Sequence, residues 1–311
     1  MIKHPVCSDV KFDLVSIDRR TQLGNTELAR VLTHDVAATS LITLYCHALE
    51  SQSKNPILSD SKAVELVQLI NPALSKSKNK LHQKMVKGKL DKKLVVHIAL
   101  RARRYDRYAT DFLQKSPDGM VVNIGCGFDA RFHRIDNNRV HFYDLDLPEV
   151  IQMKKNYLSE NDRYHYIPSS VLDMAWMKAL SRAKSQPILF LAEGIFMYLQ
   201  AEAVRHLVLK LRSEFPGSEL VCEVFNAIWF KKPWNTIIHL KLQREFHMGK
   251  DAVYHFGIRD SREMENWHSG IEFIDDWTYI DEPEPKIGWV RIFRHLHLFR
   301  RTQWTVHYRL R

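Results

Sequence analysis

The residues best placed to do chemistry begin with two glycines at the end of an apolar segment. Val121-Val122-Asn123-Ile124 runs directly into Gly125-Cys126-Gly127. Glycine permits a tight turn and lets a ligand lie against bare backbone. The N-terminus of a helix that follows such a turn presents free N–H groups. The segment therefore predicts a binding loop between a strand and a helix.

An acid follows at the spacing expected of a nucleoside-binding site. Asp146 ends the next apolar segment, 21 residues after Gly125, and a ribose-binding acid is expected after about 20 residues. The same residues also fit a dinucleotide-binding site, because Ala130 occupies the third position of the Gly-x-Gly-x-x-Gly/Ala fingerprint. These two features alone leave both NAD and S-adenosylmethionine open.

A second acid distinguishes the two cofactors. Glu193 directly follows the apolar segment Pro187–Ala192. Ligands of open α/β sheets bind beyond the carboxyl ends of the strands, so Glu193 is expected beside the cofactor pocket. A carboxylate there would pair with the α-amino group of S-adenosylmethionine. The pattern favours that cofactor, and an NAD-dependent oxidoreductase is the alternative.

Alternating strands and helices position these residues. This alternation implies an α/β fold, a Rossmann-like sheet of seven mostly parallel strands with helices on both faces. The expected strands are Met120–Ile124, Val140–Leu145, Tyr164–Pro168, Pro187–Ala192, Glu219–Phe225, Ile271–Ile280 and Trp304–Arg309, and the expected helices include Pro148–Leu158, Ala201–Phe215 and Val290–Phe299.

The first third of the chain reads as a helical extension. Apolar residues step by three or four from Leu94 to Phe112, as on one face of a helix, and the turn Ser116-Pro117-Asp118-Gly119 ends that helix. We expect residues 1–115 to form a helical cap that contributes to the cofactor and acceptor pockets. Residues 116–311 form the cofactor-binding domain, with an insertion at about 226–270.

Composition narrows the choice of partners. The net charge is +10, which suits nucleic acid, an anionic surface or an acidic small substrate. The lysine-rich stretch 76–93 has no aromatic residue among its lysines, so a solvated face is expected and a nucleic-acid methyltransferase is a less favoured alternative. The four cysteines form no C-x-x-C pair, which indicates reduced thiols and a cytoplasmic enzyme. No apolar stretch approaches the ~18 residues of a membrane span, so no membrane partner is expected.

Several sequence blocks resemble the leucine carboxyl methyltransferase family, in the bacterial branch that includes polyketide O-methyltransferases of the tetracenomycin type. The blocks are VVNIGCGFDARFHRI, VHFYDLDLPEVI, SSVLDMAWM and ILFLAEGIFMYL, with weaker support from YHFGIRDSREMENW and LITLYCHALESQSKNPILSDSKAVEL. The resemblance implies a class I methyltransferase fold, S-adenosylmethionine as cofactor, and O-methyl transfer.

The resemblance also implies roles for cofactor-binding residues. Gly125 would lie against the methionine part, Asp146 would bind the ribose hydroxyls, and Glu193 would lie near the methionyl amino group. Arg101 would pair with the cofactor carboxylate, with Arg103 and Arg104 as competitors for this role, and a guanidinium suits a carboxylate in bidentate geometry.

Three further residues follow the third strand. The adenine amino group would meet the turn that contains Ser170, Val171 and Asp173. Cys126 stands where the family commonly has alanine and is expected to be a packed small residue, not a nucleophile.

The acceptor is less well defined. A carboxylate is already ionised at neutral pH, whereas a phenol with a pKa near 10 benefits from a general base. The sequence shows no histidine with an obvious carboxylate partner, which favours a carboxylic acid such as a polyketide acid as the small-molecule acceptor. Tyr198, Tyr254 and Arg259 are candidate substrate-binding residues, with Asn226, Trp229 and His255 as weaker ones. No metal site and no catalytic residue are predicted.

Overall fold

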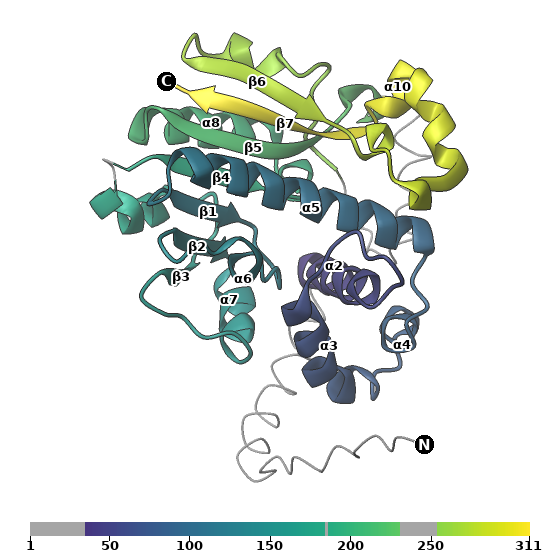
Figure 1. The fold of residues 1–311 in the computed structure, drawn as a ribbon. Helices are drawn as coiled ribbons and strands as arrows, with labels where there is room; N and C mark the ends of the chain where they lie inside the picture. The colour runs from purple at the N-terminus through teal and green to yellow at the C-terminus, as the bar shows by residue number, and fades with distance from the viewer. Residues whose placement is uncertain (1–34, 184–185, 231–253) are drawn as a thin grey trace, which may run out of the picture.

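A seven-stranded sheet forms the centre of the molecule (Figure 1). The computed structural model describes residues 35–183, 186–230 and 254–311. The strand order is β3-β2-β1-β4-β5-β7-β6. The strands are β1 (Met120–Ile124), β2 (His141–Asp146), β3 (Tyr164–Pro168), β4 (Ile188–Ala192), β5 (Ser218–Phe225), β6 (Ile271–Trp277) and β7 (Gln303–Leu310).

The sheet confirms the predicted fold class. Strands β1 to β5 pair in parallel, whereas β7 pairs antiparallel with both β5 and β6. Every residue of β1 and β4 is buried, which explains why both strands read as unbroken apolar runs: strands of a parallel sheet are covered on both faces. The carboxyl ends of β1, β2 and β4 therefore lie side by side.

Helices cover both faces of the sheet and extend beyond it (Figure 1). The α-helices are α2 (Asp35–Ser51), α3 (Ser61–Leu74), α4 (Lys80–Val86), α5 (Lys92–Lys115), α6 (Phe132–Ile135), α7 (Pro148–Lys155), α8 (Ala201–Glu214) and α10 (His297–Arg300). The 3-10 segments are η1 (Met174–Ala183), η2 (Phe196–Tyr198), η3 (Ala227–Phe230), η4 (Glu263–Trp267), η5 (Tyr279–Asp281) and η6 (Pro285–His295).

Helix α5 joins the helical cap to the sheet. Its first turn is capped by the side chain of Asp91, which accepts hydrogen bonds from the N–H groups of Lys93 and Leu94. Its C-terminal half packs on the sheet, with Tyr105 and Phe112 in one core cluster with residues of β1 and β4. Its N-terminal half extends past the sheet toward α2 and η6 (Figure 1). The predicted boundary after residue 115 therefore separates segments that share one core.

Two predicted elements near the C-terminus differ from the structure. The expected helix Val290–Phe299 is instead the 3-10 segment η6 followed by the short helix α10. Gly288 in η6 has a φ of 63°, a left-handed conformation that interrupts a right-handed helix. The expected strand Ile271–Ile280 ends at Trp277, and η5 follows. Much of the predicted insertion at 226–270 lies outside the described residues.

Candidate active site

A large pocket opens over the carboxyl ends of β1, β2 and β4. Its volume is about 1210 Å³, above the ~300–1,000 Å³ of typical small-molecule sites. Its walls come from α2, α5, η5 and η6 as well as from the loops that follow the three strands. The pocket therefore has room for a cofactor and a second small molecule.

The loop after β1 is held in a conformation that requires glycine. Gly125 and Gly127 have φ angles of +68° and +48°. A Cβ atom added at Gly127 would lie 2.6 Å from the Cβ atom of Ser40 on α2. The N–H groups of Gly125 and Cys126 donate to the carbonyl oxygen of Leu145, at 2.8 and 3.2 Å. These contacts tie the loop to the end of β2.

Asp146 stands at the tip of β2 and lines the same pocket. Its carboxylate accepts hydrogen bonds from the N–H of Gly127 at 2.7 Å and of Leu147 at 2.8 Å. Burial raises the pKa of this carboxyl group, and the two N–H donors act in the opposite direction. Each oxygen makes one of these bonds and retains a lone pair that can accept a ligand hydroxyl.

Glu193, directly after β4, is held between two arginines. Its Oε1 accepts from Nε of Arg101 at 2.7 Å, and its Oε2 accepts from Nη2 of Arg131 at 2.6 Å. Burial opposes ionisation here, but Arg131 and Arg101 lower the pKa of Glu193 below its usual value. Arg101 also donates to Glu223 at 3.0 Å. Glu193 is therefore an anion fixed in position on the pocket wall.

The polar network around Glu193 carries net negative charge. Arg134 forms ion pairs with Asp60, Asp106 and Asp129, at 2.5, 2.6 and 3.1 Å. With Glu193 and Glu223 the network holds five carboxylates against three arginines, namely Arg101, Arg131 and Arg134. It remains negative even if Glu223, whose pKa is raised by burial, carries a proton. S-adenosylmethionine, a net cation, suits this field, whereas the pyrophosphate of NAD does not.

Comparison with known proteins identifies the family. The family model for leucine carboxyl methyltransferases matches residues 40–211, more than half of the chain. The chain belongs to the leucine carboxyl methyltransferase family. Its cofactor is S-adenosylmethionine, as predicted.

Individual relatives of the chain support the same family assignment. A tetracenomycin polyketide synthesis O-methyltransferase of Streptomyces glaucescens is 27% identical over 249 residues, 80% of this chain and 84% of that protein. An S-adenosyl-L-methionine-dependent methyltransferase of Gibberella zeae is 25% identical over 256 residues, 76% of this chain and 79% of that protein. A DUF574 family protein from Streptomyces avermitilis, covering 78% of this chain and 96% of its own, has a TM-score of 0.51 at 14% identity and supports the fold alone.

The structure brings most of the predicted cofactor residues together. Gly125, Asp146, Ser170, Val171, Glu193 and Arg101 all line the pocket. The competing arginines turn away from it, since Arg103 pairs with Glu282 and Arg104 with Asp275. Arg101 and Glu193 place a cationic and an anionic group side by side on the pocket wall.

Two predicted site residues lie outside the pocket. Asp173 is exposed, and its side chain accepts from the N–H of Ala175 at 3.1 Å, so it stabilises the start of η1. Arg259 is also exposed, and its backbone N–H donates to Glu263 at 2.6 Å. Neither residue is among those that line the pocket. Tyr198 and Tyr254 do line it, with ring centroids 5.4 Å apart.

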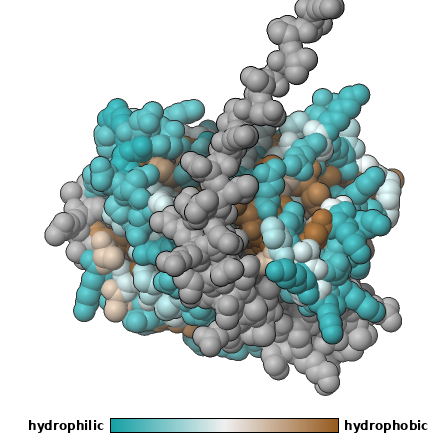
Figure 2. Space-filling model, turned by 90° about the horizontal axis from the view of Figure 1, so that it is seen from below, coloured by the Kyte–Doolittle hydropathy of each residue, from teal (hydrophilic) through white to brown (hydrophobic). Residues whose placement is uncertain are grey.

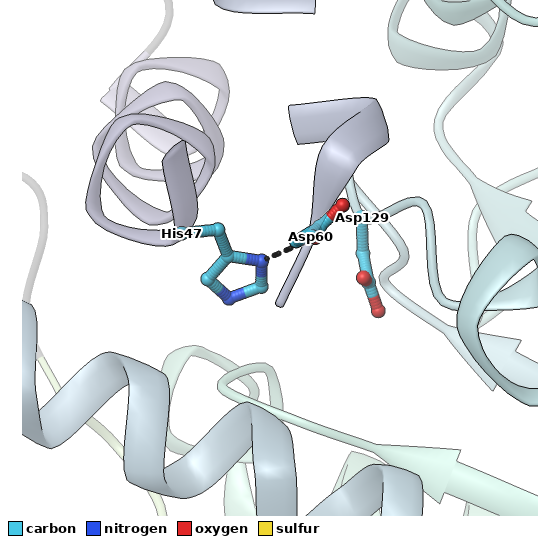
Figure 3. Close-up of side chains that lie close together, drawn as sticks. All are labelled: His47, Asp60 and Asp129. Carbon is cyan, nitrogen blue, oxygen red and sulfur yellow. Dashed lines mark hydrogen bonds and ion pairs between the residues drawn. The ribbon is translucent and has the colours of Figure 1, made fainter. Parts of the chain in front are cut away.

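A histidine with a carboxylate partner also lines the pocket, which corrects the sequence interpretation. Nδ1 of His47, on α2, lies 3.1 Å from Oδ2 of Asp60, just before α3 (Figure 3). Both side chains are buried. Burial opposes ionisation of Asp60, but the bond with His47 and the charge of Arg134 lower the pKa of Asp60. Nε2 of His47 has no hydrogen-bond partner among the described residues.

The same corner contains a third potential metal ligand. Atoms of His47, Asp60 and Asp129 lie within 4.8 Å of one another (Figure 3). However, Arg134 binds both carboxylates, and Arg131 lies 2.6 Å from Asp129. Two guanidinium groups already occupy these carboxylate oxygens, which leaves few lone pairs to coordinate a metal ion. The geometry favours an ion-pair network over a metal centre.

The pocket wall includes polar residues that sequence reasoning missed, among them His47, His97 and Arg131. Arg131 lies in the block that carries the Gly-x-Gly loop, and its position next to a binding motif was the available signal. His97 precedes Arg101 by one helical turn of α5, and its ring lies 4.3 Å from that of Tyr279. Burial and the charge of Arg101 lower the pKa of His97 to about 3, so it is neutral at neutral pH.

Proposed function

We propose that this chain transfers the methyl group of S-adenosylmethionine to the carboxylate oxygen of a small organic acid. The observation that supports this most directly is Glu193, held as an anion between Arg101 and Arg131 beside the Gly125–Gly127 loop. When bound, S-adenosylmethionine supplies a methyl group activated on a sulfonium. Family membership and the tetracenomycin polyketide relative support an oxygen acceptor, with a polyketide acid as one example.

The chain's own residues bind and align the reactants. In this proposal Arg101 and Glu193 hold the carboxylate and ammonium ends of the methionyl group, and Asp146 accepts bonds from the ribose hydroxyls. Ser170 and Val171 contact the adenine. Holding two reactants in near-attack geometry lowers a barrier by up to about 7–11 kcal/mol in ideal cases. A carboxylate acceptor needs no further group to remove a proton.

Tyr198 and Tyr254 are proposed to contact the acceptor. Both side chains line the pocket. Tyr198 lies in η2, shortly after Glu193 in the chain, and the ring of Tyr254 packs against Phe225 at the end of β5. Burial raises the pKa of Tyr198, so its hydroxyl stays protonated and can donate to a carboxylate oxygen. The remaining wall is largely apolar, which suits the body of an organic acid.

A hydroxyl acceptor is the second candidate, and His47 is the observation that favours it. Its Nδ1 is fixed by Asp60, which leaves Nε2 as the ring nitrogen able to accept a proton. A phenol would need such a base, because its own pKa is near 10.

The test compares products from matched acceptors. Purified protein is incubated with S-adenosylmethionine and either an aryl carboxylic acid or the corresponding phenol, and S-adenosylhomocysteine and methylated product are measured by mass spectrometry. The proposal predicts a methyl ester that alkali hydrolyses. Alkali-stable methyl ether from phenols alone, lost in His47→Gln, would instead establish the second candidate.

The compartment of the protein is a further part of the proposal. Cys46, Cys126 and Cys222 are buried free thiols, which supports a reducing compartment such as the cytoplasm. No described helix is both long and apolar enough to cross a membrane.

A further inference from the structure

One edge of the molecule combines basic and apolar side chains. It is formed by α4, the N-terminal end of α5, and the segment η6–α10, which lie along the right-hand side of Figure 1. These elements belong to residues 76–93 and 285–301, which we call the basic edge. They are far apart in the sequence, but α5 contacts η6 directly.

Large apolar side chains project from this edge. Trp289, Ile292, Leu296 and Phe299 are exposed by 66%, 70%, 50% and 47%. Phe293 lies between two of them, with ring centroids 5.7 Å from Trp289 and 5.3 Å from Phe299. Exposed apolar groups gathered in one place usually mark an interaction surface. Ile292 and Leu296 do not line the pocket, so an acceptor bound in the pocket would leave them uncovered.

The charges of the basic edge are largely unpaired. Residues 76–93 include eight lysines and a single acid, Asp91, and residues 285–301 include no acid. None of the eight lysines forms an ion pair with a described carboxylate, and neither do Arg291 and Arg294. The lysines are all exposed: Lys76, Lys78, Lys80, Lys84, Lys87, Lys89, Lys92 and Lys93.

The two kinds of side chain meet at the mouth of the pocket. Nζ of Lys93 lies 4.6 Å from the ring centroid of Trp289. Four exposed side chains also line the pocket and therefore lie at its mouth: Lys84, Lys89, Trp289 and Phe299. Figure 2 shows apolar surface between hydrophilic flanks on the face seen from below. A partner that covers the basic edge therefore also faces the pocket opening.

We propose that the basic edge binds the surface of an anionic lipid bilayer, with the mouth of the pocket turned toward the headgroups. Tryptophan, phenylalanine and leucine beside lysine and arginine are the composition of interfacial membrane-binding segments. Each basic residue near an anionic leaflet adds to the attraction. Binding at the interface needs no spanning helix, so it revises the sequence expectation that membranes are not partners.

Other occupants fit the observations less well. A second copy of the chain would bring two unpaired basic surfaces together, and like charges repel. Single-stranded nucleic acid would use the lysines and aromatic rings, but not the exposed aliphatic side chains of Ile292 and Leu296. Among these occupants, only an anionic surface that also accepts apolar side chains would contact both the lysines and the exposed apolar side chains of the basic edge.

The experiment is co-sedimentation of the full chain with vesicles. Wild-type protein is mixed with vesicles of phosphatidylcholine alone, or of phosphatidylcholine with phosphatidylglycerol as the minority lipid. We expect binding to the anionic vesicles, release by added salt, and little binding to the neutral vesicles. Lys87→Gln with Lys92→Gln should weaken partitioning by about fivefold per lysine. Ile292→Ser with Leu296→Ser should weaken it at least as much.

Matched variants control for charge and hydropathy elsewhere. Lys178→Gln with Arg205→Gln removes two exposed charges from η1 and α8, and Leu69→Ser with Ile274→Ser removes two exposed apolar side chains from α3 and β6. Neither control should change partitioning. Absence of binding to the anionic vesicles, or equal loss in the controls, would overturn the proposal. So would a dimer in light scattering that Ile292→Ser with Leu296→Ser converts to a monomer without any vesicle binding.

The outcome is separable from that of the proposed function. None of the substituted residues lines the pocket, so titration with S-adenosylmethionine reports folding and cofactor binding in every variant. A variant that binds S-adenosylmethionine but not vesicles isolates the basic edge. Failure of S-adenosylmethionine binding in wild type would overturn the proposed function and leave the vesicle result standing.

Discussion

The proposed cofactor half and the proposed acceptor half of the pocket are built in different ways. The cofactor half consists of short loops at the ends of β1, β2 and β4, fixed by buried ion pairs around Glu193. The acceptor half draws on η2, η5 and η6, with aromatic and apolar side chains and few ion pairs. Binding one invariant cofactor requires preorganised charge, whereas an acceptor pocket needs mainly shape and apolar surface.

The largest expected effect tests the ion-pair network of the cofactor half. Arg131 is fully buried and pairs with Asp106, Asp129 and Glu193. Arg131→Met removes the central cation of this buried network and leaves the three acids only Arg134 and Arg101 as ion-pair partners among the described residues, which should cost about 3–5 kcal/mol of unfolding free energy in denaturant titrations. The control is Arg104→Met, because Arg104 pairs with Asp275 at 3.4 Å near the surface and should cost under about 1 kcal/mol. Equal losses would show that the buried network contributes no more to stability than an ion pair outside the pocket.

Asp146 should carry the next largest effect, on affinity. Asp146→Asn removes the negative charge that we propose accepts the ribose hydroxyls, and charge-assisted hydrogen bonds contribute about 1.5–3 kcal/mol, or roughly ten- to a hundredfold in Kd. Calorimetric titration with S-adenosylmethionine measures this loss. Asp173→Asn is the matched control and should leave the Kd unchanged, because Asp173 is exposed outside the pocket. A comparable loss of affinity in Asp173→Asn would support the sequence prediction that Asp173 contacts the adenine.

Gly127 tests how tightly the loop is held against α2. Gly127→Ala places a side chain at a positive φ, which costs about 1–2 kcal/mol, and brings its Cβ to 2.6 Å from that of Ser40. Thermal unfolding should show a lower Tm. Adding Ser40→Gly removes the steric contact but not the strain, so it should restore only part of the loss. Full restoration would mean that the backbone conformation is unimportant.

In the acceptor half the expected effect is on the acceptor alone. Tyr198→Phe removes the proposed hydrogen bond to the acceptor carboxylate, worth about 1.5–3 kcal/mol because the acceptor is charged, so the KM for the acceptor should rise about ten- to a hundredfold. The Kd for S-adenosylmethionine should stay unchanged, because the phenyl ring still fills its place. Steady-state kinetics with the best acceptor measure the first quantity. Arg259→Gln, which alters an exposed residue away from the pocket, should change neither.

The last effect is a pH dependence of stability that comes from His97. Its folded pKa lies far below the unfolded value of about 6.5, because burial and Arg101 disfavour the imidazolium. Below about pH 6.5 the unfolded chain binds a proton that the folded chain does not, so stability falls as the pH falls. The slope from one such group is at most about 1.4 kcal/mol per pH unit. His97→Asn should reduce this slope between pH 6.5 and 5; an unchanged slope would mean that His97 protonates freely when folded.

The site combines residues that the sequence predicts with residues that only the fold brings together. Buried parallel strands read as apolar runs, so the sheet and the positions of Gly125, Asp146 and Glu193 at its edge follow from the sequence. The partners of Glu193 do not, because Arg101 and Arg131 come from a helix and a loop that only the fold brings together. The pairing of His47 with Asp60 likewise depends on how α2 packs against α3.

The C-terminal segments are harder to predict for a local reason. Residues 290–299 have helical periodicity, but they are divided between the end of the 3-10 segment η6 and the short helix α10. Segment η6 contacts α5, and no spacing in the sequence signals these contacts. The sequence predicts Asp173 in the site from its turn after the third strand, and Arg259 from the irregular segment after the fifth strand. Both side chains are exposed outside the pocket, because a position in the sequence does not fix where a side chain lies.

The most direct test of the central claim is calorimetric titration of the wild-type chain and Glu193→Gln with S-adenosylmethionine and, separately, with NAD. The account predicts that wild type binds S-adenosylmethionine and not NAD, and that Glu193→Gln, still folded by circular dichroism, binds it at least tenfold more weakly. Binding of NAD alone, or undiminished binding of S-adenosylmethionine to folded Glu193→Gln, would contradict the assignment of this pocket.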